Sequence, residues 1–331
     1  MHGLVLFMDA PPHWLDQLII LFNNQFPESS FFSFIWNVRA LLALILVSIC
    51  CGSVGSLVVG GRMAFFSDAL AHCAFAGVSI GFLLFEAFLA PYRPAGEFWT
   101  WVTPVMVVFG MLIGAGIALV RARSGLASDT VIGVFFAAAI GLAALIRKLI
   151  VSRNLFSLED FLFGDPMLAT ADDLVALGAL VVVTLGILAA IYNHLLLASF
   201  NNSLALSRRV PVRLANYAFI VLLALIVNLC LRSVGVLLIN ALLIVPAATG
   251  VNVCRNLRQL FWFTISFCMF VSMMGLWGSW ELGTRCRVEL GIPGAIVLLS
   301  VGLFVLSLFL GPLWKNRRTA RAQDRLAKTP A

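Results

Sequence analysis

Charged residues are scarce in this chain, and their scarcity excludes a water-soluble protein. Asp, Glu, Lys and Arg make up 11% of the 331 residues, whereas hydrophobic residues make up 62% and the mean hydropathy is +1.04. A typical soluble domain has about 25% charged and about 45–50% apolar residues. Because this much apolar surface needs lipid as its solvent, we expect a protein that crosses a membrane several times.

Several sequence patterns are also missing. There is no G-x-x-x-x-G-K-[ST] phosphate loop, so we expect no ATP hydrolysis by this chain, no enzyme activity and no bound cofactor. The seven cysteines lack paired spacing, which argues against a disulfide framework or a cysteine zinc cluster. Met1–Leu6 lacks the basic stretch of a cleavable signal peptide. The net charge of +7 is typical of membrane orientation, and nucleic-acid binding is not expected.

Nine apolar segments follow a mixed N-terminal region, and each approaches the ~20 residues that span a bilayer. They lie at about 37–60, 64–89, 98–120, 129–151, 174–198, 215–231, 234–251, 260–280 and 293–313. The pattern predicts an all-α, polytopic transmembrane helical bundle of about nine membrane segments. We divide the chain into an extracytoplasmic or interfacial segment (1–36), a transmembrane domain (37–313) and a basic cytoplasmic tail (314–331).

The distribution of charge predicts that the N-terminus is outside and the C-terminus inside. This orientation places most of the 22 basic residues on the inner side and most of the 15 acidic residues on the outer side. Acidic residues gather in the outer segment 152–173, where they could raise the local cation concentration or form an ordinary solvated loop. They are Glu159, Asp160, Asp165, Asp172 and Asp173.

Two polar residues lie in the second span, where a bilayer should reject them. Asp68 and His72 are four residues apart, which places them on one face of a helix, and a carboxylate and an imidazole together suit zinc or manganese. An acid kept within a span usually lines a pathway or holds an ion. The alternative is an Asp near the membrane face that bonds to its neighbours. Small residues form a second stripe beside the pair and predict a close helix contact: Ala69, Cys73, Gly77 and Gly81.

The seventh span carries a proline that removes a backbone donor. We expect Pro246 to kink or break this helix, and Asn240 and Thr249 are candidates to satisfy the freed groups. Broken helices often line transport paths. On the inner side, the loop Ser199–Leu214 could form a short amphipathic helix on which a partner protein could push, although most such loops only connect.

Four stretches, in this order along the chain, resemble the membrane permease of the bacterial zinc/manganese/iron ABC transporter family. They are G-S-V-G-S-L-V-V-G-G-R-M-A-F-F-S-D-A-L-A-H at 52–72, S-D-T-V-I-G at 128–133, F-L-F-G-D at 161–165 and V-G-V-L-L-I-N-A-L-L-I-V-P-A-A-T at 234–249. The D-A-L-A-H and A-L-L-I-V-P-A-A-T segments are the more specific. The resemblance covers roughly residues 35–313.

The resemblance implies a permease homodimer in the bacterial cytoplasmic membrane, with two cytoplasmic ATP-binding subunits and an extracytoplasmic metal-binding protein. It places Asp68 and His72 in the path of the transported metal, for which zinc is our first expectation and manganese or iron the alternatives. It also implies that the inner loop docks on the ATPase. Within this ATPase-coupling loop, many relatives have an acid where Asn201 stands and a glycine where Arg209 stands. The expected coupling residues are Asn201, Leu204, Arg208, Arg209 and Pro211.

Two other functions fit parts of the sequence. A proton-coupled secondary transporter should show inverted repeats with paired broken helices, and the chain has one proline-broken segment without a convincing repeat. A membrane scaffold would use Asp68 and His72 only to bond to each other. The lead hypothesis is therefore a permease subunit that imports a divalent transition metal and is energised by a separate ATPase.

Overall fold

The computed structural model describes residues 14–27, 30–61, 63–89, 98–149, 164–200, 212–286 and 290–327. Helices account for nearly all of these residues, and no strand occurs among them. The α-helices are α1 (Trp14–Asn23), α2 (Ile35–Gly60), α3 (Ala64–Leu84), α4 (Phe98–Ser124), α5 (Ser128–Leu149), α7 (Ala171–Phe200), α9 (Val212–Val234), α10 (Val236–Val253), α11 (Leu257–Cys286) and α12 (Ile292–Ala327). Single turns of other helix types are η2 (Phe31–Ser33), η3 (Phe85–Leu89) and η5 (Pro166–Leu168).

Within the described ranges, nine helices are long and apolar enough to cross a membrane, which confirms the predicted fold class. They begin and end within a few residues of the nine predicted segments, except that α12 continues as a helix to Ala327, through most of the segment assigned to the tail. In lipid only a helix satisfies its own backbone hydrogen bonds, so each long apolar run forms one.

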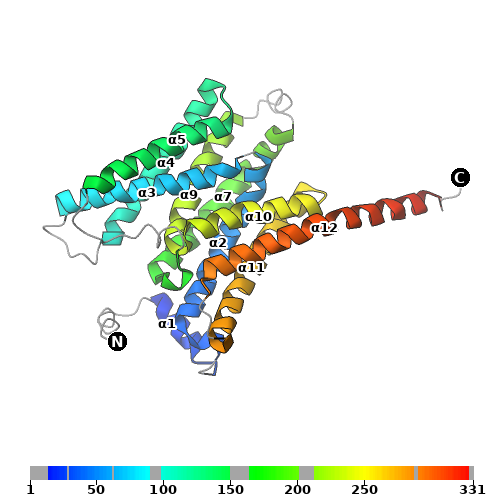
Figure 1. The fold of residues 1–331 in the computed structure, drawn as a ribbon, viewed down its shortest axis with the longest axis horizontal. Coiled ribbons are helices and arrows are strands. Elements are labelled where there is room, and N and C mark those ends of the chain that lie inside the picture. Colours follow the sequence, from blue (N-terminus) through cyan, green and yellow to red (C-terminus); the bar gives the residue numbers. More distant parts are fainter. Residues whose placement is uncertain are drawn as a thin grey trace.

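The helices form two groups around α2 (Figure 1). Helices α3, α4 and α5 lie together on one side, α10, α11 and α12 lie on the other, and the C-terminal part of α12 projects beyond the bundle. Of the most apolar stretch of α2, 67% is buried, compared with 28% in α5, α7 and α12. Helix α2 is therefore central, and these three helices leave most of their surface for lipid or a partner.

Small residues allow the closest helix contacts. The stripe on α3 packs against α4, where Gly77 lies against the backbone of Met106 and Gly81 against Val102. Ala69 and Cys73 are buried. The predicted close contact of this stripe with another helix is thus confirmed.

The proline of α10 does not break the helix, which is continuous through Pro246. Proline has no backbone N–H, so the carbonyl oxygen of Leu242 loses its usual helical donor. The thiol of Cys268 on α11 lies 3.3 Å from this oxygen and donates to it. The predicted partners were wrong, because Thr249 donates to the oxygen of Val245 and Asn240 donates to another helix. A neighbouring helix therefore supplies the missing donor.

Two glycines with positive φ bring the segment before α7 against the junction between α9 and α10. Gly164 has φ 58°, Gly235 has φ 81°, and their backbones are in contact, so a side chain on Gly164 would collide with Gly235. The left-handed conformation and the lack of space together require glycine at this position. This contact brings the described end of the F-L-F-G-D motif against the start of α10.

Candidate functional site

Asp68 and His72 share one face of α3, as their spacing predicted. The Nδ1 atom of His72 lies 3.7 Å from Oδ1 of Asp68, and the side chains are 32% and 44% exposed, respectively. An acid that is almost half exposed on a membrane-spanning helix needs a polar environment, since contact with lipid costs several kcal/mol. This face of α3 is therefore suited to a hydrated path or to the surface of a partner subunit.

The imidazole of His72 is oriented by its own helix. Its Nδ1 lies 2.9 Å from the backbone oxygen of Asp68, one turn earlier. An imidazole that donates from Nδ1 to a carbonyl keeps its lone pair on Nε2, and this is how metal-binding histidines are commonly held. Phe136 of α5 packs against the ring, with centroids 4.8 Å apart at 66°. The arrangement fixes the ring and leaves Nε2 as the atom available for a ligand.

Asn240 joins this pair from α10. Its Nδ2 donates to Oδ1 of Asp68 at 2.9 Å, whereas its own Oδ1 is buried without a hydrogen-bond partner. A buried amide oxygen without a partner is costly, so it marks a position where a ligand atom would be stabilised. The sequence had placed Asn240 on the proline-containing seventh span, as a candidate partner for freed backbone groups. Nothing in the sequence indicated that Asn240 and Asp68, 172 positions apart, are in contact.

The described residues do not form a complete metal site. No group of three or more His, Cys, Asp or Glu side chains that could hold a metal ion occurs among the described residues. The available donors are one carboxylate, one imidazole and one amide oxygen, from Asp68, His72 and Asn240. The side chains of Asp68 and His72 are partly exposed, whereas the amide oxygen of Asn240 is buried, so the three groups do not enclose a cation in this structure.

Part of the predicted site cannot be placed. Asn201, Leu204, Arg208, Arg209 and Pro211 lie outside the described residues. Pro246 is on α10 with Asn240, but it is buried and its role is in the helix contact with α11.

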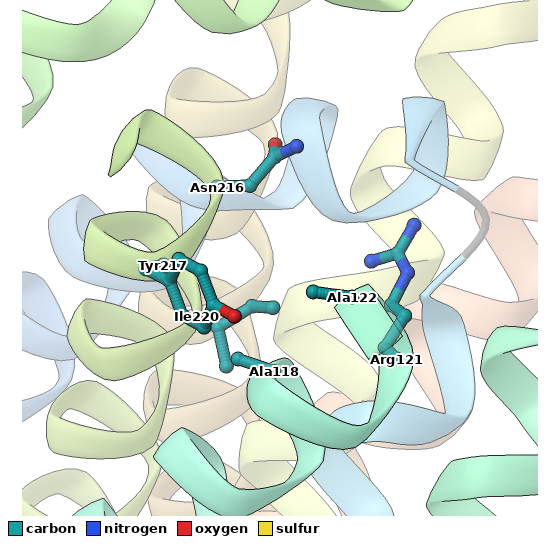
Figure 2. A pocket seen from close by; sticks show the side chains of 6 residues that line it. All are labelled: Ala118, Arg121, Ala122, Asn216, Tyr217 and Ile220. Atoms are coloured by element: carbon teal, nitrogen blue, oxygen red, sulfur yellow. The ribbon is translucent and has the colours of Figure 1, made fainter. Parts of the chain in front are cut away.

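A cavity of about 200 Å³ lies between the end of α4 and the start of α9. Figure 2 shows Arg121, Asn216 and Tyr217 around it, and its remaining lining residues are Ala118, Ala122 and Ile220. The guanidinium of Arg121 donates to the sulfur of Met63 at 3.0 Å. The cavity contains neither Asp68, His72 nor Asn240, so it is separate from the candidate metal site.

A partly buried ion pair that sequence reasoning missed connects three helices. Arg232 of α9 binds Asp173 of α7 at 3.1 Å and donates to Thr103 of α4 at 2.9 Å. Asp173 also accepts hydrogen bonds from the backbone and hydroxyl of Thr170, and so caps α7. The acidic segment was expected either to raise the local cation concentration or to form an ordinary solvated loop, and neither expectation included the burial of Asp173 in this network. In the sequence, the one indication of a buried partner was the isolated basic residue Arg232 near the end of the sixth span.

In the part of the chain that the structure describes, an all-helical bundle with nine candidate spans carries a half-exposed Asp–His pair on one helix, and this architecture is that of a polytopic membrane protein. Comparison with known proteins identifies the family to which the chain belongs. The profile of the ABC 3 transport family matches residues 33–311, and the chain belongs to this family. It is thus a permease of the metal-ion ABC importer class and a multi-pass protein of the bacterial cytoplasmic membrane.

Relatives cover nearly the whole chain. The "Manganese import system permease protein ScaB" of Streptococcus parasanguinis is 29% identical over 291 residues, which are 88% of this chain and 95% of that protein. The "High-affinity zinc uptake system membrane protein ZnuB" of Haemophilus influenzae is 28% identical over 272 residues, 82% of this chain and 95% of that protein. The solved structure of PsaBC from Streptococcus pneumoniae in complex with Fab superimposes with a TM-score of 0.67 at 27% identity, covering 84% of this chain and 93% of that one.

Proposed function

We propose that two copies of this chain form the membrane path of an importer for divalent manganese or zinc, with Asp68 and His72 contacting the ion. The observation that carries the proposal is the Asp68–His72–Asn240 group: a carboxylate, an oriented imidazole and an unpartnered amide oxygen in one place. The family membership supports it independently.

Dimerisation would complete the site. A two-fold axis beside the exposed face of α3 would bring together two carboxylates, two imidazoles and two amides. In the ion-free state Asn240 holds the Asp68 carboxylate by an N–H···O bond. An arriving cation would compete with this bond for Oδ1. Because the hydrogen bond re-forms when the ion leaves, the exchange would keep binding weak enough for release.

The donor set supports manganese ahead of zinc. Carboxylate and amide oxygens suit manganese, which accepts six ligands, whereas zinc prefers four nitrogen or sulfur ligands in a tetrahedron. With Asn240 included, oxygens outnumber nitrogens at the site, which the sequence-based preference for zinc did not take into account. The relatives include proteins named for manganese and for zinc, so their names leave both metals open.

The rest of the transporter consists of partner proteins. Two cytoplasmic ATP-binding subunits would act on the 200–213 loop, and an extracytoplasmic binding protein would deliver the metal. With the N-terminus outside, that loop and the C-terminal tail face the ATPase, and the Asp173–Arg232 network faces the binding protein. ATP binding would then move the helices around Asp68 and His72.

The test is metal uptake into proteoliposomes that contain the whole complex, with manganese, zinc and iron offered separately. We expect Asp68→Asn and His72→Ala to lower uptake at least about tenfold, which corresponds to about 1.4 kcal/mol. The matched control is His194→Ala, because His194 is a half-buried histidine on α7. Normal uptake by the His72 variant would show that the pair is structural.

The scaffold alternative predicts a different geometry. It requires Asp68 and His72 to satisfy each other, but His72 bonds to the backbone of Asp68 and its Nδ1 is 3.7 Å from the carboxylate. The site is therefore described better as a set of available ligands than as a closed structural pair.

A further inference from the structure

The N-terminal segment lies outside the part of the chain that the family model matches. The family profile begins at residue 33, whereas α1 and η2 lie before or at that point. Helix α1 lies at the end of the bundle where α2 begins and α11 ends (Figure 1). Residues 14–27 and 30–34 therefore form a structure whose role the transport fold does not explain.

An ion pair holds α1 to the bundle. Oδ1 of Asp16 lies 2.6 Å from Nη2 and 3.0 Å from Nε of Arg39, and the two side chains are only 13% and 17% exposed. Arg39 is in the second turn of the membrane-spanning helix α2, and its guanidinium lies 6.0 Å from the ring of Trp36. A cation at this depth needs a counter-ion. Asp16 provides it from outside the transmembrane domain.

Aromatic rings continue this attachment. Phe22 and Phe26 contact Phe32, which packs edge-on against Phe31, and Phe31 packs edge-on against Trp280 of α11. The side-chain amide of Asn37 also donates to the carbonyl of Phe31 at 3.0 Å. The segment is thus fixed to two membrane helices and presents its outer surface in a defined orientation.

Helix α1 has three different faces. Ile19 and Asn23 are buried against the bundle. Leu18, Leu21 and Phe22, at positions i, i+3 and i+4, form an exposed apolar face, with exposures of 56%, 64% and 43%. Gln17 is exposed and polar and lies beside the apolar face, and Asn24, which directly follows the helix, is also exposed and polar. Trp14 and Ile20 are further exposed apolar residues of α1, at 59% and 42%. This order of faces is that of a helix that lies at a boundary between protein, hydrocarbon and water.

We propose that α1 is a membrane-interface helix whose Leu18–Leu21–Phe22 face inserts among the lipid chains of the leaflet in which α2 begins. Phe34 and Trp36, which are 47% and 51% exposed at the start of α2, continue this apolar surface toward the bilayer. The one acidic residue of α1 is used for Arg39, so no charge remains on the helix to oppose insertion. Asp16 couples the position of α1 to the depth of α2.

Lipid fits this face better than a protein does. The face carries no charged group and little hydrogen-bonding capacity with which to recognise the extracytoplasmic binding protein. Even with Trp14, Ile20, Phe34 and Trp36 included, the exposed apolar side chains here are far fewer than the roughly 20–30 residues per side in a stable protein–protein interface. The surface is instead continuous with the lipid-facing surface of the spans.

Site-directed spin labels test the proposal in the full chain, reconstituted in nanodiscs of phosphatidylethanolamine and phosphatidylglycerol. Cys254 and Cys286, the two cysteines that are not buried, are first replaced by serine. Labels are then placed at positions 18 and 21 on the apolar face, and at the matched positions 17 and 24 on the polar face. We expect labels 18 and 21 to collide more with oxygen than with a water-soluble nickel chelate, and labels 17 and 24 to show the reverse.

Three outcomes would overturn the proposal. Equal, high nickel access at all four positions would place α1 in water. Protection from both reagents, with a short distance between the labels at position 18 of two copies, would identify a second chain as the occupant. Loss of oxygen access on adding the extracytoplasmic binding protein would identify that protein.

A second variant tests the role of Asp16. Asp16→Asn removes the counter-ion but keeps the shape, so the label at position 18 should become more mobile and lose at least half of its excess oxygen access. The double variant Asp16→Asn/Arg39→Gln removes both charges and should recover most of the lost access. Identical spectra in the single variant and the parent would contradict the coupling of α1 to Arg39.

Discussion

At the residue scale, the candidate site depends on a contact that links two distant motifs. Asp68 and His72 could be placed on one face from their spacing alone, because helix geometry fixes which side chains are neighbours. The contact between Asp68 and Asn240 could not be predicted, because it depends on how α10 lies beside α3. Asn240 is therefore the residue through which the structure adds most to the sequence.

Replacing Asn240 by leucine, which has a similar size, should weaken metal binding about 10–100-fold. The Asp68 carboxylate loses a charge-assisted hydrogen bond worth about 1.5–3 kcal/mol, and the site loses an amide oxygen. The measurement is the metal concentration that gives half-maximal uptake by the complex. Asn252→Ala on the same helix is the control, because Asn252 donates to Ser307 instead. Equal effects of the two substitutions would mean that the amide acts on folding only.

A second residue-scale prediction concerns Gly110. A Cβ at this position would lie 2.1 Å from Nδ2 and 2.5 Å from Cγ of Asn228, which is completely buried. Gly110→Ala should therefore destabilise the protein by about 1–3 kcal/mol, because α4 and α9 must move apart. Thermal unfolding in detergent measures the effect.

Two variants make the Gly110 prediction specific. Gly178→Ala, on a helix position with no atom within 4 Å of the added methyl group, should be neutral or slightly stabilising. Asn228→Ala, introduced together with Gly110→Ala, should recover part of the lost stability because it removes the colliding amide. If the Gly110→Ala and Gly178→Ala variants unfold at the same temperature, the prediction of a close contact between α4 and α9 at Gly110 is wrong.

At the scale of elements, the apolar runs determined most of what could be predicted. The nine spans and their limits followed from length and hydropathy, and the small-residue stripe of α3 identified a face for close packing. The behaviour of α10 did not follow, because the sequence around Pro246 contains no sign of the thiol on α11 that bonds to Leu242. The Asp173–Arg232 pair was missed for the same reason, since its partners come from different helices.

The Leu242 carbonyl gives a prediction for α10 and α11. Cys268→Ala removes the thiol donor and should destabilise the protein by about 1 kcal/mol, as expected for one modest hydrogen bond. In a Pro246→Ala background the backbone N–H of residue 246 supplies the donor to the Leu242 carbonyl. Cys268→Ala should therefore destabilise the protein less in this background. Thermal unfolding of the four proteins of this cycle gives the coupling energy. A coupling of zero would show that the thiol contributes only packing.

At the scale of the whole molecule, orientation is the property on which the proposed direction of transport depends. The excess of basic residues on one side predicts that the N-terminus is outside and the C-terminus inside. Two native cysteines can test this prediction directly. Cys254 lies between α10 and α11, Cys286 lies at the end of α11 on the opposite side of the membrane, and the other five cysteines are buried.

In intact cells, a membrane-impermeant maleimide should label Cys286 but not Cys254, and both should react after the membrane is opened. Burial raises the pKa of the Cys254 thiol, so its reactive thiolate fraction is smaller and its labelling should be the slower of the two even in opened membranes. Cys286→Ser should abolish labelling in intact cells. Labelling of Cys254 alone in intact cells would reverse the orientation, and the 200–213 loop would then face away from any cytoplasmic ATPase. The Asp68–His72 path could still conduct a metal in that case, but the direction and the coupling to ATP proposed for this chain would both be wrong.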